Sequence, residues 1–247
     1  MTLNFALPLE DFDSNSRFET KYRIRMVDYY AIKNALGPYF KPDPYTQIAP
    51  NKKYLVRSLY YDTRDYRMYT EKMDGDCNRI KFRIRTYGTD PNKDPDIRFE
   101  MKVRKGNLMQ KFGSFVTHQQ YLSFLDRGFL CSSEDVVLME FGRFVKRLNL
   151  APKMLVQYKR EGFHSRTLEG IRLTFDHRII SAHAKQLFPE NIFWRRHHRT
   201  QVVLEIKHQN NLPEWLNKLI HTYHLKVVPN SKYTNSVEIA SRETILA

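Results

Sequence analysis

Five segments of the chain alternate between apolar and charged residues with a period of two, the repeat of a β-strand. In the segment RFETKYRIRM every second residue is charged, and the residues between them are aromatic, aliphatic or Thr. The other four segments repeat the pattern more briefly. The five segments are residues 17–26, 79–87, 97–104, 171–176 and 202–207. They predict an antiparallel sheet with one apolar and one charged face.

The charged face of this sheet is unusual because it holds almost only Arg, Lys and Glu. A face that is simply solvated is the plain alternative, but such faces usually mix Ser, Thr, Asn and Lys. Like charges that lie opposite one another across a sheet repel, so a polyanionic ligand would explain why so many cations are tolerated. A closed or nearly closed β-barrel with a charged lumen and an apolar outside meets these requirements.

Segments with helical spacing provide the apolar cover that such a barrel needs. The helices are expected from Asp28 to Gly37-Pro38, from near Asp62-Thr63 through Tyr66 and Tyr69, from Ser133 through Leu148, from Pro213 through Ile220, and from Asn230 or Ser231 through Ala240. Loops are expected at 41–53, 88–96 and 181–200. No linker or internal repeat is found, so the prediction is one α+β domain over residues 1–247, an antiparallel barrel-like tunnel surrounded by helices.

The overall charge indicates an anionic partner. The 247 residues include 41 Lys+Arg and 27 Asp+Glu, for a formal net charge of +14. Nucleic acid, phosphate chains and an acidic membrane face are the candidate anions. Nucleic acid is disfavoured because the cations alternate with core residues and do not form one exposed stripe.

No segment approaches the ~18 apolar residues of a membrane span, and the N-terminus does not resemble a signal peptide. A cytoplasmic location is therefore expected.

Four carboxylates stand among the cations of the charged face, at Glu19, Glu100, Asp176 and Glu205. Each can be an ordinary salt-bridge partner of Arg or Lys. Alternatively, one or two of them coordinate Mg²⁺ or Mn²⁺, hard ions that take oxygen ligands and bridge to substrate phosphates. The chain has no Walker motif and no GxGxxG motif, so side chains would have to bind any phosphates.

Eight short segments, in order along nearly the whole chain, resemble the VTC domain. These are FETKY (18–22), SLYYDT (58–63), EKMDG…RIKFRIRTYG (71–88), FEMK (99–102), YKREGF (158–163), IRLTFD (171–176), VLEIK (203–207) and SKYTNS (231–236). The VTC domain is the polyphosphate polymerase domain of the vacuolar transporter chaperone complex, with stand-alone bacterial relatives. It belongs to the triphosphate tunnel metalloenzymes, a CYTH-like superfamily.

The resemblance implies a tunnel that binds ATP or another nucleoside triphosphate with Mn²⁺ or Mg²⁺. The terminal phosphoryl group is then transferred to inorganic polyphosphate. By motif, the catalytic phosphate-binding residues are Lys21, Arg83, Arg85, Lys102, Arg160, Arg172 and Lys232. Further substrate-binding residues are Tyr158, Ser231, Arg23 and Lys81, and the metal ligand is Glu205, with Glu100 and Glu19 as weaker candidates. The strand cations among these residues are expected to converge on one cavity.

Two departures from the family pattern bear on the activity. Hydrolase and cyclase relatives open with an ExExK strand, whereas this chain has Arg17 at the first position. This favours the polymerase over a two-metal hydrolase. The eukaryotic polymerase also carries a phosphate-sensing module and membrane helices, so its regulation is not expected here. A tripolyphosphatase or nucleoside triphosphatase of the same fold, and a non-catalytic polyphosphate-binding module, remain the alternatives.

Overall fold

The alternating segments form strands of one antiparallel sheet. The computed structural model describes residues 18–93, 95–106, 108–130, 134–167, 170–209 and 211–244. The strands are β1 (Phe18–Arg25), β2 (Phe40–Pro42), β3 (Tyr54–Asp62), β4 (Asn78–Thr86), β5 (Ile97–Lys105), β6 (Leu108–Val116), β7 (Ala151–Ser165), β8 (Arg172–His183), β9 (Arg195–Arg196) and β10 (Gln201–His208). Their main path is β1-β10-β8-β7-β3-β4-β5-β6, with β2 and β9 attached to β7 and β8.

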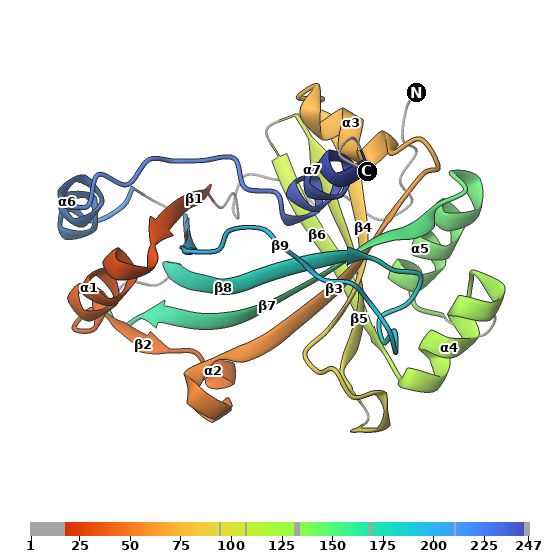
Figure 1. Cartoon of the computed structure of the whole chain (residues 1–247), viewed down its shortest axis with the longest axis horizontal. Helices are drawn as coiled ribbons and strands as arrows, with labels where there is room; N and C mark the ends of the chain where they lie inside the picture. The colour runs from red at the N-terminus through yellow and green to blue at the C-terminus, as the bar shows by residue number, and fades with distance from the viewer. Residues whose placement is uncertain are drawn as a thin grey trace.

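Seven α-helices accompany the sheet in the described part of the chain (Figure 1). They are α1 (Met26–Leu36), α2 (Pro44–Ile48), α3 (Arg67–Met73), α4 (His118–Arg127), α5 (Val136–Arg147), α6 (Glu214–Thr222) and α7 (Lys232–Thr244). In the view of Figure 1, α1 and α6 lie at one end of the long strands and α4 and α5 at the other, whereas α3 and α7 lie above them. Among the described residues, no helix is long and apolar enough to cross a membrane.

Strand register places the charged residues of separate strands on the same face. Lys21 on β1 pairs with Glu205 on β10, and Arg83 on β4 pairs with Glu100 on β5. Since side chains alternate along a strand, the charged residues two positions away share that face. The charged face therefore runs across the sheet from β1 to β6.

The sheet curls toward its charged face. β1 is one edge of the hydrogen-bonded path and β5 lies next to the other edge, yet Lys102 Nζ on β5 is 3.5 Å from Glu19 Oε2 on β1. In the described residues the backbone pairing stays open between β1 and β6, so side chains join the two edges. The predicted α+β fold with a charged, barrel-like tunnel is confirmed, in the form of an open sheet.

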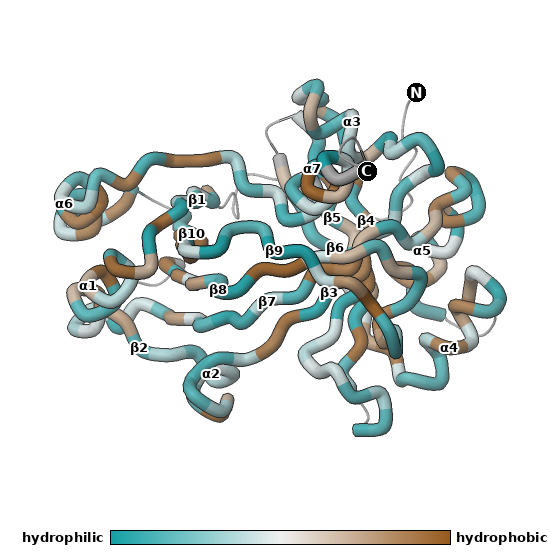
Figure 2. The backbone as a smooth tube through the Cα atoms, in the orientation of Figure 1, coloured by the Kyte–Doolittle hydropathy of each residue, from teal (hydrophilic) through white to brown (hydrophobic). Residues whose placement is uncertain are grey.

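The opposite face of the sheet is apolar and covered by helices. At one end, Phe82 and Phe99 pack against Phe141 of α5, with ring centroids 5.6 and 4.9 Å apart. At the other end, a second cluster joins Leu204 on β10 to Ile32 of α1. Hydrophobic and hydrophilic residues alternate along these strands and helices in Figure 2. Burial of the apolar face supplies the main free energy that holds the curved sheet together.

The predicted helix start near Asp62-Thr63 is wrong. Asp62 is the last residue of β3, and α3 begins five residues later at Arg67. Asp62 Oδ1 accepts the backbone N–H of Met68, so the residue caps the helix from a distance. Tyr66 precedes α3 in the left-handed region, with φ of 60°. The segment lacks a clear strand signal because β3 is buried on both faces and does not alternate.

Other expected boundaries also shift. Helix α1 begins at Met26, and Asp28 lies in its first turn, where it accepts a hydrogen bond of 2.7 Å from Arg25. Helix α5 begins at Val136 because Asp135 caps it. The expected loop at 41–53 contains α2, which Asp43 caps, and a short 3₁₀ turn. The expected loop at 88–96 holds another 3₁₀ turn, and β8 and β9 take up parts of 181–200.

Phe141→Ala should lower the free energy of unfolding by about 3–5 kcal/mol, because it leaves a cavity among four other aromatic rings. Phe193, which is 73% exposed, is the matched control, and its replacement by Ala should change stability by less than about 0.5 kcal/mol. Urea unfolding followed by circular dichroism measures both. Equal losses in the two variants would contradict this description of the core.

Candidate functional site

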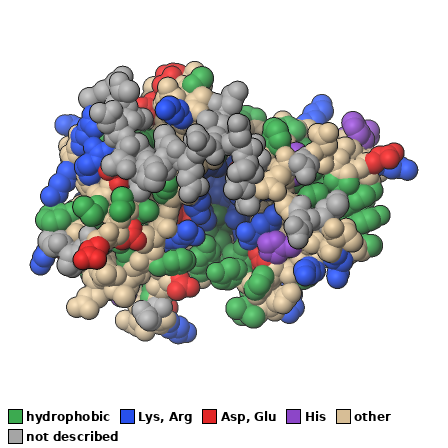
Figure 3. Space-filling model, turned by 180° about the vertical axis from the view of Figure 1, so that it is seen from behind, with side chains coloured by type: hydrophobic (Ala, Val, Ile, Leu, Met, Phe, Trp, Pro, Cys, Tyr) green, Lys and Arg blue, Asp and Glu red, His purple; other side chains and the backbone are tan. Residues whose placement is uncertain are grey.

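The charged face and the first turn of α7 enclose a hollow that we call the charged trough. Figure 3 shows Lys and Arg side chains gathered in a depression near the middle of one face of the molecule. The trough cations are Lys21, Lys81, Arg83, Arg85, Lys102, Lys111, Arg160, Lys207 and Lys232, and the carboxylates are Glu19, Glu100, Asp176 and Glu205. Cations therefore outnumber carboxylates, which suits an anionic ligand.

Asp176 is fully buried and joins two cations from different elements. Its carboxylate accepts two hydrogen bonds from Arg160, of 2.6 and 2.8 Å, and one of 2.5 Å from Lys232. Burial would raise the pKa of Asp176, but the charges of Arg160 and Lys232 hold it at about 2. The carboxylate is therefore ionised at neutral pH and fixes α7 against β7 and β8.

Glu205 and Glu19 share two lysines. Lys21 Nζ is 2.5 Å from Glu19 and 3.8 Å from Glu205, and Lys207 Nζ is 3.7 Å from Glu19 and 3.1 Å from Glu205. Burial would raise the pKa of both carboxyls, and the charge of Glu205 also raises the pKa of Glu19. The lysines outweigh these effects, lowering the pKa of Glu205 well below its usual value and that of Glu19 to about 2. Both are ionised.

Glu100 forms a separate group of ion pairs on β4, β5 and β6. Its carboxylate is 2.5 Å from Arg83 Nε and 3.7 Å from Arg85 Nε, and it also pairs with Lys111. Burial would raise the pKa of Glu100, but the charges of Arg83, Arg85 and Lys111 lower it well below its usual value, so the carboxylate is charged at neutral pH. Its surroundings are those of a counter-ion for arginine.

The Glu19–Glu205 pair fits a hard divalent cation. Mg²⁺ commonly binds one or two carboxylates and completes its coordination with water and substrate phosphates. Both carboxylates are ionised, and the lysines that now neutralise them could turn to phosphate oxygens instead. The described residues contain no group of three or more His, Cys, Asp or Glu side chains that could hold a metal. A bound phosphate would therefore have to complete the site.

Helix α7 inserts its first turn into the trough. Lys81 donates a hydrogen bond of 3.0 Å to Ser231 Oγ, and Ser231 Oγ accepts the backbone N–H of Thr234. The ring of Tyr158 lies beneath two cations, 4.5 Å from Lys232 Nζ and 5.2 Å from the Arg160 guanidinium carbon. The Ser-Lys pair that the sequence singled out thus lies beside Lys81, Arg160 and Tyr158.

Two predicted residues lie elsewhere. Arg172 Nη2 is 3.1 Å from Asp43 Oδ2 at the rim of the trough, and its side chain is 43% exposed. Arg23 is exposed and forms no hydrogen bond or ion pair within the described ranges, although its charge helps to lower the pKa of His198. The structure thus brings Lys21, Arg83, Arg85, Lys102 and Arg160 together. Arg172, the register partner of Lys207, lies on the same face at the rim of the trough, and Arg23 is exposed. Arg17 lies outside the described residues.

Two trough cations were not selected from the sequence. Lys207 lies in an alternating segment and shares the parity of Glu205, so its position could have been inferred. Lys111 could not, because β6 (LMQKFGSFV) shows no charge alternation. In β6 a glycine faces the trough at position 113, where a Cβ would lie 2.7 Å from Arg98 Nε. Gly113 therefore makes room for another arginine of the charged face.

A second buried cluster of charges lies on the opposite face of the sheet. Glu161, which is fully buried, pairs with Lys33, with Lys53 at 3.3 Å and with His177 at 2.8 Å. Burial would raise the pKa of Glu161, but the hydrogen bonds from His177, Lys33 and Tyr29 lower it to about 2. The cluster ties α1 to β7 and β8, and it contains none of the predicted site residues.

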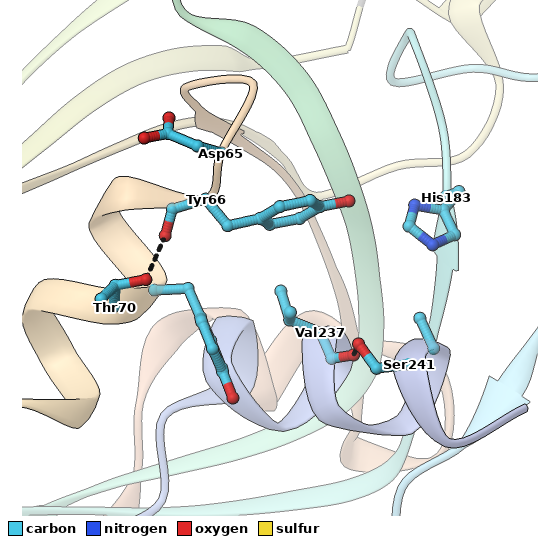
Figure 4. Close-up of a pocket in the computed structure, with 8 residues that line it drawn as sticks. Asp65, Tyr66, Thr70, His183, Val237 and Ser241 are labelled. Carbon is cyan, nitrogen blue, oxygen red and sulfur yellow. Dashed lines mark hydrogen bonds between the residues drawn. The ribbon is translucent and has the colours of Figure 1, made fainter. Parts of the chain in front are cut away.

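A cavity of about 310 Å³ lies beside α7 but outside the charged trough (Figure 4). It is lined by Asp65, Tyr66, Tyr69, Thr70, His183, Val237, Ala240 and Ser241. The lining is mostly tyrosine and small side chains, and none of the predicted site residues belongs to it.

The fold and the trough thus define an α+β protein with a cation-lined tunnel, and the family model of the VTC domain matches residues 16–241. The chain belongs to the VTC domain family, as the sequence motifs predicted.

No curated protein matches the chain. Among solved structures, a candidate adenylate cyclase from Bacillus halodurans has a TM-score of 0.48 at 14% identity, covering 88% of this chain and 96% of that one. The PH1819 protein from Pyrococcus horikoshii has a TM-score of 0.47 at 14% identity, covering 93% and 99%. A candidate adenylate cyclase from Vibrio parahaemolyticus has 0.45 at 11%, covering 91% and 97%.

Lys81→Met should stabilise the ligand-free protein at neutral pH. Burial, together with the charges of Arg79 and Lys72, lowers the pKa of Lys81 from 10.5 to about 7. The unfolded chain therefore binds this proton more tightly than the folded protein does, and the free energy of unfolding rises with pH between about 7 and 10.5. Allowing for solvent screening, we expect the free energy of unfolding of Lys81→Met to exceed that of the wild type by about 1–3 kcal/mol at pH 7.

The difference should shrink toward pH 10, where the lysine is neutral in the folded protein. Denaturant unfolding at the two pH values measures it. Lys105→Met, at an exposed neighbouring position, is the control and should follow the wild type. Equal stability of the Lys81→Met protein and the wild type at pH 7 would contradict the assignment.

Proposed function

We propose that the protein is a metal-dependent phosphotransferase that moves the terminal phosphoryl group of ATP onto a polyphosphate chain inside the charged trough. The observation that carries this proposal is the convergence of five predicted phosphate-binding cations, Lys21, Arg83, Arg85, Lys102 and Arg160, on one face of the sheet. Membership of the VTC domain family supports the same activity.

The trough supplies what phosphoryl transfer requires, which is alignment of the phosphates and neutralisation of their charge. Arg83 and Arg160 offer planar guanidinium groups that can bind two phosphate oxygens at once. Lys21 and Lys102 act as point charges beside them. Because Glu100 and Asp176 already hold Arg83 and Arg160 in place, these two arginines gain little further order when the substrate binds.

Glu205, with Glu19 beside it, is the part of the trough that would hold Mg²⁺ or Mn²⁺. The ion would supply Lewis acidity toward the phosphate oxygens and neutralise charge in the transition state. The chain's own residues do the rest. Lys21 and Lys207 are released from the two carboxylates to contact phosphate, and the surrounding buried side chains limit the access of water.

Lys232 and Ser231 would meet the acceptor chain. The first N–H groups of α7 have no partners inside the helix and its dipole is positive at this end, so an anion is favoured there. Lys232 Nζ lies 2.5 Å from Asp176, whose other partner is Arg160. A phosphate that approaches Lys232 therefore also approaches the arginine expected to bind the nucleotide.

An aromatic cluster marks the end of the trough where the nucleoside would bind. Tyr54 is the register partner of Arg160 and so shares its face of the sheet. The rings of Tyr45 and Tyr54 are 5.6 Å apart, and those of Tyr45 and Tyr87 are 5.7 Å apart. Tyr45 is 48% exposed. Exposed rings next to phosphate-binding arginines offer a stacking surface for a nucleobase.

Incubation with ATP labelled at the γ-phosphate, with Mn²⁺ or Mg²⁺, tests the proposal directly. A ladder of labelled products on a gel would support the polymerase. Free phosphate as the sole labelled product would instead indicate a triphosphatase. Binding of ATP without turnover would indicate a non-catalytic polyphosphate-binding module.

Glu205→Gln should reduce turnover by about 100-fold or more, because a carboxamide keeps one oxygen but loses the charge that holds a hard cation. The circular dichroism spectrum should stay that of the wild type. Glu214→Gln, on the exposed surface of α6, is the control and should keep full activity. Full activity of Glu205→Gln across a range of Mn²⁺ concentrations would rule out the metal assignment.

Lys232→Ala should keep nucleotide binding and lose chain elongation. Asp176 retains its two hydrogen bonds to Arg160 in this variant, so the nucleotide side of the trough stays ordered. A non-hydrolysable ATP analogue should still raise the melting temperature, while the ladder shortens or disappears. Lys226→Ala, on the exposed segment before α7, is the matched control. If Lys232→Ala formed ladders of normal length at the normal rate, α7 would have only a structural role.

A further inference from the structure

The cavity of about 310 Å³ in Figure 4 lies between α3 and α7, and we call it the helix cavity. Its floor is apolar, since Val237 and Ala240 of α7 are each only 6% exposed. Two half-buried tyrosines form its walls, and its rim is polar and exposed. The walls are Tyr66 and Tyr69, and the rim is Asp65, Thr70, His183 and Ser241. An apolar floor, aromatic walls and a few polar groups are typical of a small-molecule site.

The helix cavity differs from the charged trough in its charge. Besides His183, its lining contains one ionisable acid or base, the carboxylate of Asp65, apart from the two tyrosines, and it contains no Lys or Arg. The whole chain, by contrast, carries a formal net charge of +14. A phosphate group would therefore find no Lys or Arg to bind in this lining.

Asp65 is available to a cationic ligand. A hydrogen bond from Thr63 lowers the pKa of Asp65, so the carboxylate is ionised at neutral pH. Arg67 and Lys153 lower its pKa a little further, but neither lines the cavity, and Asp65 forms no ion pair with another described residue. An unpaired carboxylate at the rim attracts a positively charged group.

Tyr66 is held across the cavity in an unusual backbone conformation. Its φ of 60° and ψ of 40° lie in the left-handed region, which bulky residues rarely adopt. Its carbonyl accepts the backbone N–H groups of Tyr69 and Thr70, and these bonds hold the conformation at the start of α3. In Figure 4 the side chain of Tyr66 points toward His183 on the far side of the cavity. Residues strained in this way cluster at ligand sites.

The tyrosine walls suit an ammonium group. The ring of Tyr66 already attracts one ammonium, because Lys153 Nζ lies 4.8 Å from its centroid without lining the cavity. Burial and the charge of Asp62 raise the pKa of Tyr66, so its phenol stays neutral at neutral pH. An ammonium ion between aromatic rings and a carboxylate gains both cation–π attraction and charge pairing.

We propose that the helix cavity binds a small organic ammonium ion. The ammonium group lies beside Asp65 and the rings of Tyr66 and Tyr69, and the hydrocarbon part packs on Val237 and Ala240. This ligand has the opposite charge to the one that suits the trough, and its binding does not depend on the proposed function.

The ligand would also stabilise the helix that covers the trough. Helix α7 starts at Lys232, which bonds Asp176 in the trough, and lines the helix cavity with residues one to two turns later. A compound that binds between α3 and α7 in the folded protein only must raise the melting temperature.

The test uses three probes that share one skeleton and differ in charge: phenethylammonium, 2-phenylethanol and 3-phenylpropionate. Binding to the full-length protein is measured by NMR titration at neutral pH. We expect phenethylammonium to bind with a Kd on the order of 1 mM, as suits a ligand of this size, and roughly tenfold more tightly than the other two. Equal binding of the three probes, or no binding of phenethylammonium, would overturn the proposal.

Asp65→Asn should weaken binding of phenethylammonium by about fivefold and leave binding of 2-phenylethanol unchanged. Asp74→Asn is the matched control, because it removes the same charge from an exposed position at the end of α3, outside the lining. It should bind all three probes as the wild type does. Wild-type affinity in Asp65→Asn, or an equal loss in Asp74→Asn, would refute the role of Asp65.

Two further variants locate the site. Ala240→Leu should fill part of the helix cavity and weaken binding of both phenethylammonium and 2-phenylethanol, with the melting temperature verifying that the protein is folded. Glu205→Gln should bind phenethylammonium as the wild type does, because its carboxylate lies in the trough. Unchanged binding in a folded Ala240→Leu protein, or a loss in Glu205→Gln, would place the ammonium ion outside the helix cavity and overturn the proposal.

Discussion

The charged face depends on one constraint, which is that buried cations must have counter-charges. Removing a charge from water costs several kcal/mol, and a neighbouring opposite charge offsets this only when hydrogen bonding is good. Asp176 meets that condition with two hydrogen bonds from Arg160 and one from Lys232. Because these residues come from β7, β8 and α7, the same carboxylate that allows two cations to be buried also positions the helix that covers the trough.

The carboxylates divide the cations into groups with different uses. Glu100 keeps Arg83 and Arg85 beside Lys111, and the Glu19–Glu205 pair keeps Lys21 and Lys207 in place. These side chains are ordered before any ligand arrives.

The sequence predicted the part of the fold in which each strand has one apolar and one charged face. β1, β4, β5 and β10 follow that pattern and were found within one or two residues of their bounds. β3 was not, because both of its faces are buried and its residues therefore do not alternate. β7 was identified only through a motif, since a register shift near Tyr158 breaks its pattern.

The candidate site, like the fold, could be predicted from the sequence only in part. Strand parity was enough to place Lys21, Arg83 and Lys102 together. It placed Arg172 on the same face but could not predict that its side chain turns to Asp43, the residue that caps α2 and is distant in sequence. It also could not find the counter-charge pattern, which depends on how far the sheet curls and on which strands meet across the trough.

Asp62 shows how helices α3 and α7 are held on the same strand. It ends β3, accepts the backbone N–H groups of Met68 and Tyr69 in α3, and accepts a hydrogen bond of 2.5 Å from the hydroxyl of Tyr233 in α7. Helix α7 carries Lys232 of the trough. A single buried carboxylate therefore fixes both helices relative to the same strand.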